Sequence, residues 1–213
     1  MKEGLKPLVN SKLIKEICMS KIYVIYGTMS SSKTANLCMN AHNYEEVGKI
    51  PLVIKPSFDT RSKEGKISSR IGLERDCIEL GKDDNLYEIV KLQNKVDVCL
   101  IDECQFLEPH HVKEIVDVCD ILNIPVMCYG LKNSSNGELF ESMKRLIFEA
   151  DKITEIKSMC GICGTKKATH HLRYYKGELF LNVERMVGDV KEGEVRYVSC
   201  CRSCYYNPPK NLK

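Results

Sequence analysis

The stretch GTMSSSKT, residues 27–34, gives the first indication of how this chain folds. A phosphate-binding loop follows the pattern Gly, four residues, then Gly-Lys-Ser/Thr. Gly27 and the pair Lys33-Thr34 are in register with that pattern, whereas Ser32 stands where the second glycine belongs. Glycine is used there because φ is positive or because the phosphate approaches the backbone closely, so Ser32 is expected to cost about 1 kcal/mol in strain.

The residues on either side of this loop complete a strand, loop and helix. KIYVIYG (21–27) is a β-branched and aromatic run that predicts a buried strand. SKTANLCMNAHNYEEVG (32–48) has apolar residues at helical spacing. Because a P-loop binds phosphate through successive backbone N–H groups and a helix N-terminus, we expect triphosphate contacts from Gly27, Thr28, Met29, Ser30, Ser31, Ser32, Lys33 and Thr34. The alternative is that the serines only cap a helix.

Further along the chain, apolar runs alternate with helical patterns. The runs predict strands at 51–57, 96–103 and 124–130 and helices at 110–123 and 141–150. The polar segment 59–95 between them is expected to form a loop or hairpin followed by a short helix at about 85–91. Alternating strands and helices predict an α/β fold with a mostly parallel sheet, helices on both faces and a ligand at the carboxyl ends of the strands.

IDECQF (101–106) places two carboxylates at the end of a predicted strand. An Asp at this point holds Mg²⁺ in P-loop proteins, so Asp102 is the predicted metal-side carboxylate. Glu103 points elsewhere and is available as a general base. Standing alone, the two acids would be an ordinary exposed strand end, but the P-loop upstream favours the functional interpretation.

Five of the twelve cysteines lie in the last 54 residues, in CGIC (160–163) and CCRSC (200–204). Two Cys-x-x-Cys pairs are the ligand set of a tetrahedral structural zinc, whereas a redox dithiol needs only one pair. The predicted ligands are Cys160, Cys163, Cys201 and Cys204, which leaves Cys200 over and makes His170 and His171 unnecessary. We expect an N-terminal helical extension (1–20), a nucleotide-binding domain (21–155), a zinc-binding domain (156–206) and a tail (207–213).

Composition excludes several classes of protein. The chain of 213 residues is 43% hydrophobic and 29% charged, as in a soluble globular protein, and its net charge of +3 does not require a polyanionic partner. It contains no apolar run of about 18 residues and no apolar core of secretory length near its start. We therefore expect a cytoplasmic protein with reduced thiols and no membrane segment.

In order and spacing, these motifs resemble those of the type II thymidine kinases, which combine a P-loop (RecA-like) domain with a zinc-bearing lasso domain. The resemblance covers about residues 21–206 and rests on GTMSSSKT, FDTR, SSRIG, IDECQF, YGLKNSSNGELF, CGIC and YVSCCRSC. It implies transfer of the γ-phosphate of ATP to the 5′-hydroxyl of thymidine or deoxyuridine, in nucleotide salvage. It also implies a homotetramer whose partners are small molecules, with no nucleic acid.

The resemblance assigns roles residue by residue. Lys33, Thr34 and Asp102 would hold the triphosphate and Mg²⁺, and Glu103 would accept the proton of the nucleoside hydroxyl. Asp59, Arg61 and Gln105 would lie on the ATP and metal side, and the nucleoside would contact Met29, Phe106, Leu131, Phe140 and Tyr197. Ordinary core packing is the alternative for the apolar residues, and an exposed ion pair is the alternative for Asp59 and Arg61. Zinc would anchor the lasso at 167–199, so its removal should loosen the substrate site rather than the chemistry.

Three departures from the family pattern point to the substrate site. Ser32 replaces the loop glycine, Ser134 and Ser135 stand where an acid or small residue and a phenylalanine are usual, and the lasso is more charged than usual before Tyr197. One aromatic wall of the nucleoside pocket is therefore expected to be missing. Two alternatives stay open: a nucleotide-binding paralogue with weak or altered activity, and an ATP-dependent nucleic-acid-binding protein, which the absence of a basic stripe disfavours.

Overall fold

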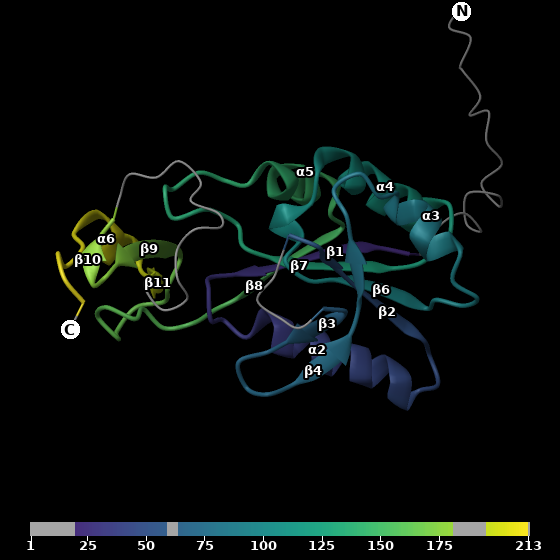
Figure 1. Cartoon of the computed structure of the whole chain (residues 1–213), viewed down its shortest axis with the longest axis horizontal. Coiled ribbons are helices and arrows are strands. Elements are labelled where there is room, and N and C mark those ends of the chain that lie inside the picture. The colour runs from purple at the N-terminus through teal and green to yellow at the C-terminus, as the bar shows by residue number, and fades with distance from the viewer. Residues whose placement is uncertain (1–19, 59–63, 181–194, 213) are drawn as a thin grey trace, which may run out of the picture.

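A sheet of six parallel strands forms the centre of the larger part of the molecule (Figure 1). The computed structural model describes residues 20–58, 64–180 and 195–212. In spatial order the strands are β5 (Ile78–Leu80), β2 (Pro51–Pro56), β6 (Val98–Ile101), β7 (Val126–Gly130), β1 (Ile22–Gly27) and β8 (Lys152–Ile156). Every neighbouring pair in this sheet is parallel, which confirms the predicted α/β class.

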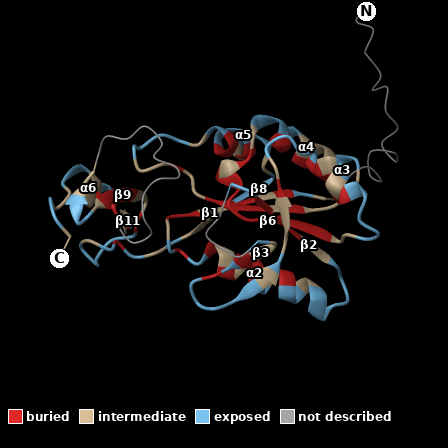
Figure 2. Cartoon of the chain, viewed as in Figure 1, coloured by how far each residue is buried: buried red, intermediate tan, exposed pale blue. Residues whose placement is uncertain are grey.

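Helices cover both faces of this sheet, as predicted. One face carries α3 (Leu86–Lys91), α4 (Pro109–Asp120) and α5 (Glu141–Glu149); the other carries α2 (Lys33–Glu46) and the hairpin of β3 (Lys66–Ser68) and β4 (Glu74–Asp76) (Figure 1). Two clusters of buried side chains, one on each side of the sheet, join these layers (Figure 2). The apolar period of each helix therefore positions it, and the carboxyl ends of β1, β2, β6 and β7 remain available for the site.

The last part of the chain forms a small β-rich unit, called here the C-terminal unit, which consists of 157–180 and 195–212. Its sheet pairs β9 (His170–Tyr175) antiparallel with β10 (Glu178–Leu179) and β11 (Val195–Cys200), and α6 (Arg202–Tyr206) follows. Alternate residues of the strands point to opposite faces. Leu172, Tyr174, Val198 and Cys200 form the unit's own core, while His171, Arg173, Tyr197 and Ser199 occupy the opposite face.

Within the part of the chain that the structure describes, no helix is long and apolar enough to cross a membrane. The predicted N-terminal helical extension lies outside the described residues except for Ser20.

Candidate active site

The loop between β1 and α2 has the course of a P-loop, with serine in backbone conformations that favour glycine. Ser32 precedes the first residue of α2 at φ 64° and ψ 29°, and Ser30 has φ 60°. A side chain in this left-handed region costs about 1 kcal/mol or more relative to glycine. The predicted strain at Ser32 is therefore present, and the serine keeps its backbone N–H.

Replacing Ser32 with Gly is expected to stabilise the protein. Strain is relieved in the folded state, although the added chain entropy of glycine when unfolded offsets part of the gain. We expect Tm to rise by about 2 °C, with ATP binding equal or tighter, as measured by differential scanning fluorimetry and calorimetry. Ser31→Gly is the matched control, because Ser31 is not among the positive-φ residues and should show no gain. A lower Tm for Ser32→Gly would show that the serine is adapted to this loop.

At the start of the loop, Gly27 cannot be replaced by a larger residue without movement of the backbone. A Cβ atom there would lie 2.6 Å from the carbonyl oxygen of Ile156, in the neighbouring strand β8. At the other side of the loop, the Arg70 guanidinium donates a hydrogen bond to the Ser30 hydroxyl. Arg70 belongs to the SSRIG motif, so this contact brings a further cation to the loop that is predicted to bind phosphate.

Lys33, Thr34 and Asp102 come together as the P-loop interpretation requires. The Lys33 ammonium donates to the Thr28 carbonyl over 2.9 Å, and the Thr34 hydroxyl donates to Asp102 Oδ2 over 2.9 Å. A hydroxyl beside a carboxylate, with a buried lysine close by, is a donor set that suits Mg²⁺ and phosphate. These residues therefore fit the group that the sequence predicted.

Asp102 and Glu103 are neighbouring carboxylates in a buried setting. Burial, together with the charge of Glu103, raises the pKa of Asp102 to about 7, although the Thr34 hydroxyl opposes the shift. A cation bound at Asp102 would reverse this balance, because it favours the charged form. The raised pKa of Asp102 therefore suits a group that would bind a cation.

Glu103 has the strained backbone that often accompanies a functional side chain. Its φ is 49°, and its N–H donates to Asp102 Oδ1 over 3.1 Å. The Gln105 amide nitrogen donates to Glu103 Oε2, and the Gln105 amide oxygen accepts from the Leu131 N–H over 2.9 Å. The backbone at Glu103 is therefore left-handed, and the Gln105 amide holds one oxygen of its carboxylate.

Gln105 was predicted to lie on the side of the site that binds ATP and the metal ion, and its contact with them stays a prediction. Its amide lies with Glu103 and Leu131, and its carbonyl accepts from the Ser142 hydroxyl over 2.8 Å. Gly130 allows this arrangement, because a Cβ atom there would lie 2.6 Å from the Gln105 amide oxygen.

Three aromatic rings gather around Phe106, three residues after Glu103. The centroid of Phe106 lies 5.4 Å from that of Phe58 and 6.1 Å from that of Phe140. Phe106 and Phe140 were predicted to contact a nucleoside, and the structure brings them together. Phe58 was not predicted; it follows β2 and is 52% exposed, so part of its ring can receive a flat ligand. Asp59 and Arg61, next in the chain, lie outside the described residues.

Two other predicted nucleoside contacts lie where the loop meets the C-terminal unit, Met29 in the loop and Tyr197 in β11, whereas Leu131 lies beside Gln105. The Met29 N–H donates to His171 Nε2 over 2.9 Å, and the Met29 carbonyl accepts from the Ser199 hydroxyl over 2.7 Å. The guanidinium carbon of Arg173 lies 5.8 Å from the centroid of the Tyr197 ring. Sequence reasoning missed His171 and Ser199, because nothing local marks a side chain that binds a loop 142 or 170 residues away.

The four predicted metal ligands form one cluster. The sulfur atoms of Cys160, Cys163, Cys201 and Cys204 all lie within 4.8 Å of one another, and Cys200 is not part of the group. Tetrahedral zinc with bonds of about 2.3 Å requires sulfur atoms about 3.8 Å apart, and Cys163 and Cys201 are 4.0 Å apart. Hydrogen bonds from Thr165 and neighbouring N–H groups lower the pKa of Cys163 to about 5, which favours the thiolate. The cluster could therefore hold a metal ion.

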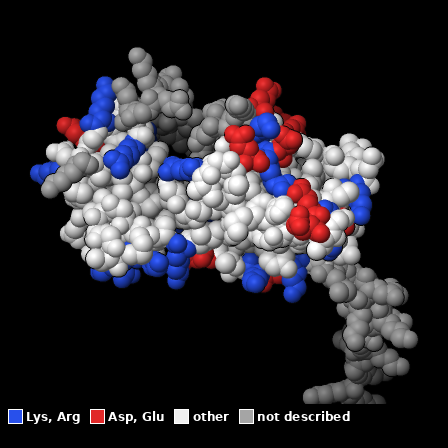
Figure 3. All heavy atoms as spheres, turned by 90° about the horizontal axis from the view of Figure 1, so that it is seen from below, with Lys and Arg blue, Asp and Glu red and all other residues white. Residues whose placement is uncertain are grey.

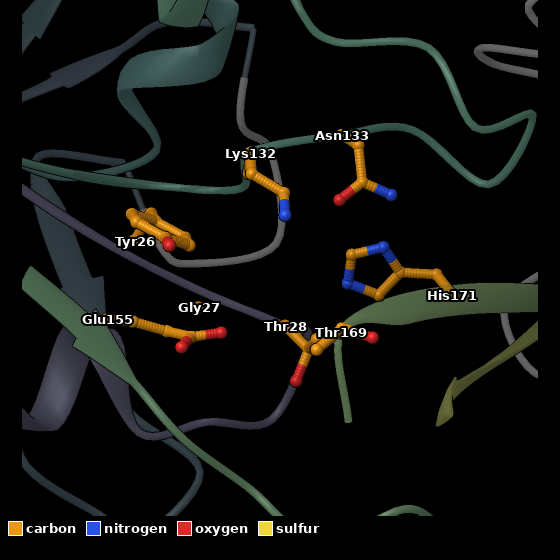
Figure 4. A pocket seen from close by; sticks show the side chains of 8 residues that line it. All are labelled: Tyr26, Gly27, Thr28, Lys132, Asn133, Glu155, Thr169 and His171. Carbon is orange, nitrogen blue, oxygen red and sulfur yellow. The ribbon is translucent and has the colours of Figure 1, made fainter. Parts of the chain in front are cut away.

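A small polar pocket marks the junction of the two units behind the loop (Figure 4). It is lined by Tyr26, Gly27, Thr28, Lys132, Asn133, Glu155, Thr169 and His171. Its cavity volume of about 10 Å³ is about the space of one water molecule and far below the range for organic ligands. The pocket therefore does not compete with the aromatic cluster as a substrate site.

Comparisons with known proteins agree with this geometry. The family model described as thymidine kinase matches residues 20–205. A protein named thymidine kinase from Lactiplantibacillus plantarum is 43% identical over 197 residues, which cover 92% of this chain and 100% of the relative. Proteins of the same name from Enterococcus faecalis and Listeria monocytogenes are 41% and 42% identical, over 89% and 90% of this chain and 96% and 99% of their own length.

Proposed function

Because this chain belongs to the thymidine kinase family, we propose that it transfers the γ-phosphate of ATP to the 5′-hydroxyl of thymidine or deoxyuridine. One observation carries the proposal: Glu103 follows Asp102, which binds the Thr34 hydroxyl, and the Glu103 carbonyl accepts from the N–H of Phe106 in the aromatic cluster. The proposed phosphate site and the proposed site for a flat base would therefore lie on either side of Glu103. The C-terminal cysteines would hold a structural zinc ion.

In the proposed reaction, the protein contributes position and charge. The loop N–H groups and Lys33 bind the phosphates of ATP, and the aromatic cluster holds the base. Mg²⁺, held through Thr34 and Asp102, would neutralise charge on the phosphates when bound. Glu103 accepts the proton of the 5′-hydroxyl, which is a poor nucleophile at neutral pH. Gln105 keeps the accepting oxygen oriented.

The proposal extends to properties that rest on the resemblance alone. These are ATP and thymidine as small-molecule partners, a homotetramer, a cytoplasmic location and a role in nucleotide salvage. A nucleic-acid-binding function receives no support from the comparisons. On the face shown in Figure 3, basic and acidic side chains are interspersed with uncharged surface rather than gathered into a basic stripe.

A panel of nucleosides tests the proposed substrate class. Zinc-containing protein with ATP and Mg²⁺ is expected to phosphorylate thymidine and deoxyuridine, with the product identified by chromatography. A thymidine analogue without the 5′-hydroxyl should yield nothing, whereas one without the 3′-hydroxyl should still react. If ATP binds but no nucleoside is phosphorylated, the weak-paralogue alternative is favoured instead.

A further inference from the structure

One residue of the phosphate loop is bound on both sides by the C-terminal unit. The Met29 N–H donates to His171 Nε2, and the Met29 carbonyl accepts from the Ser199 hydroxyl, over 2.9 and 2.7 Å. His171 and Ser199 lie directly opposite each other in β9 and β11. A single cross-strand pair therefore binds both polar backbone groups of one loop residue; we call these three residues the Met29 bridge.

The His171 ring also reaches the loop that follows β7. The ring lies between Asn133 and Thr28 in Figure 4, and both residues line the pocket beside it. Asn133 is two residues beyond Leu131, whose N–H binds Gln105. One imidazole thus connects the phosphate loop with the segment that helps to orient Glu103.

The chemistry of this imidazole fits a fixed structural acceptor. Nε2 can accept a hydrogen bond only if it carries no proton, so the ring is neutral with its proton on Nδ1. The side chain is buried, at 2% exposure. That burial, followed by the charge of Lys33, lowers the pKa of His171 to about 4. The ring therefore stays in its accepting form at neutral pH.

The loop has a particular need for external support. Ser30 and Ser32, which follow Met29 in the loop, both have positive φ values and both carry a side chain. Each serine would lower its conformational energy by leaving that conformation, because the left-handed region is unfavourable for residues other than glycine. Hydrogen bonds to Met29 oppose such a change. A further bond joins the same two units next to the bridge, between the Thr28 and Ser158 hydroxyls over 2.8 Å.

We propose that His171, together with Ser199, is a positioning residue that holds the phosphate loop in its ATP-binding conformation from the C-terminal unit. The inference rests on the proposed function for its catalytic consequence, because the loop is expected to bind ATP. It differs from the expectation that the C-terminal unit serves only the nucleoside. It assigns that unit a second task, which is to preserve a loop that lacks its usual glycine.

Variants at position 171 separate positioning from general stability. His171→Phe keeps a ring but removes the acceptor, whereas His171→Gln can place an amide oxygen near the former Nε2. His170→Phe is the matched control, because the His170 ring packs on Tyr205, 4.7 Å between centroids, whereas the Met29 N–H binds His171. Each variant is first checked for zinc content and Tm.

Hydrogen exchange of the peptide that contains Met29 is the first measurement, made without ATP or nucleoside. Loss of one hydrogen bond is expected to speed exchange of this amide about tenfold in His171→Phe, with partial recovery in His171→Gln and no change in His170→Phe. This result does not depend on turnover, so it stands or fails separately from the proposed function.

The kinetic readout is the KM for ATP at saturating thymidine. We expect it to rise about tenfold in His171→Phe with a smaller change in kcat, and to recover partly in His171→Gln. Ser199→Ala combined with His171→Phe should be less than additive, since both act through Met29. Unchanged exchange and KM in zinc-loaded His171→Phe, or an equal loss in His170→Phe, would overturn the proposal.

Discussion

Replacement of Glu103 by Gln is expected to lower kcat about 10²–10⁴-fold while ATP still binds. Gln has nearly the same shape but cannot accept a proton from the nucleoside hydroxyl. The backbone bond from residue 103 to Asp102 does not require the carboxylate. Removal of the negative charge should also ease the ionisation of Asp102, since Glu103 contributes to its raised pKa. Metal and ATP binding should therefore survive the substitution.

The rate is measured by formation of ADP at saturating thymidine, and ATP binding by calorimetry. Glu149→Gln is the control, because Glu149 is an exposed glutamate at the end of α5. It should retain the full rate. If Glu103→Gln kept a normal rate, the proton would have to leave by another route, and Glu103 would lose its proposed role.

Replacement of Cys163 by Ser is expected to release the metal ion and to unfold much of the C-terminal unit. Structural zinc contributes about 10–16 kcal/mol of apparent binding free energy in small domains, which is comparable to the stability of the whole unit. We expect zinc to fall from one ion per chain to nearly none, with a lower Tm and a KM for thymidine at least tenfold higher. Metal is measured by mass spectrometry and KM by steady-state kinetics.

Cys200→Ala is the matched control for that substitution. Cys200 is fully buried in the same unit and adjacent to a predicted ligand, but it lies outside the sulfur cluster. It should cost some stability through packing while keeping one zinc ion per chain. A metal-free Cys163→Ser protein with full affinity for thymidine would contradict the link between the metal and the substrate site.

Sequence reasoning reached the central strands and the loop because their signals are local. IYVIYG and VCLI are fully apolar runs, as parallel strands covered on both faces require. The edge strands β5 and β8 were missed for the converse reason. Ile78–Leu80 has only three residues, and Lys152–Ile156 (KITEI) has only two apolar residues and three exposed positions, so neither resembles a buried strand.

The residues of the candidate site likewise fall into those that local sequence patterns predict and those that they do not. Lys33, Thr34, Asp102 and the four cysteines follow spacing rules, and the structure brings each group together. Phe58 and His171 obey no such rule, because their roles depend on which distant segments meet them in the fold. The orientation of Glu103 by Gln105 likewise depends on a left-handed backbone at residue 103, which the identity of that residue does not predict. Only coordinates could show these contacts.

The fate of labelled phosphate tests the central claim most directly. Zinc-containing protein is incubated with ATP labelled at the γ-phosphate, Mg²⁺ and thymidine, and the labelled products are separated. We predict that the label moves to thymidine 5′-monophosphate and that Glu103→Gln suppresses this transfer. Label that appears only as inorganic phosphate, or that stays on ATP although ATP is bound, would contradict the claim that this site transfers phosphate from ATP to a nucleoside.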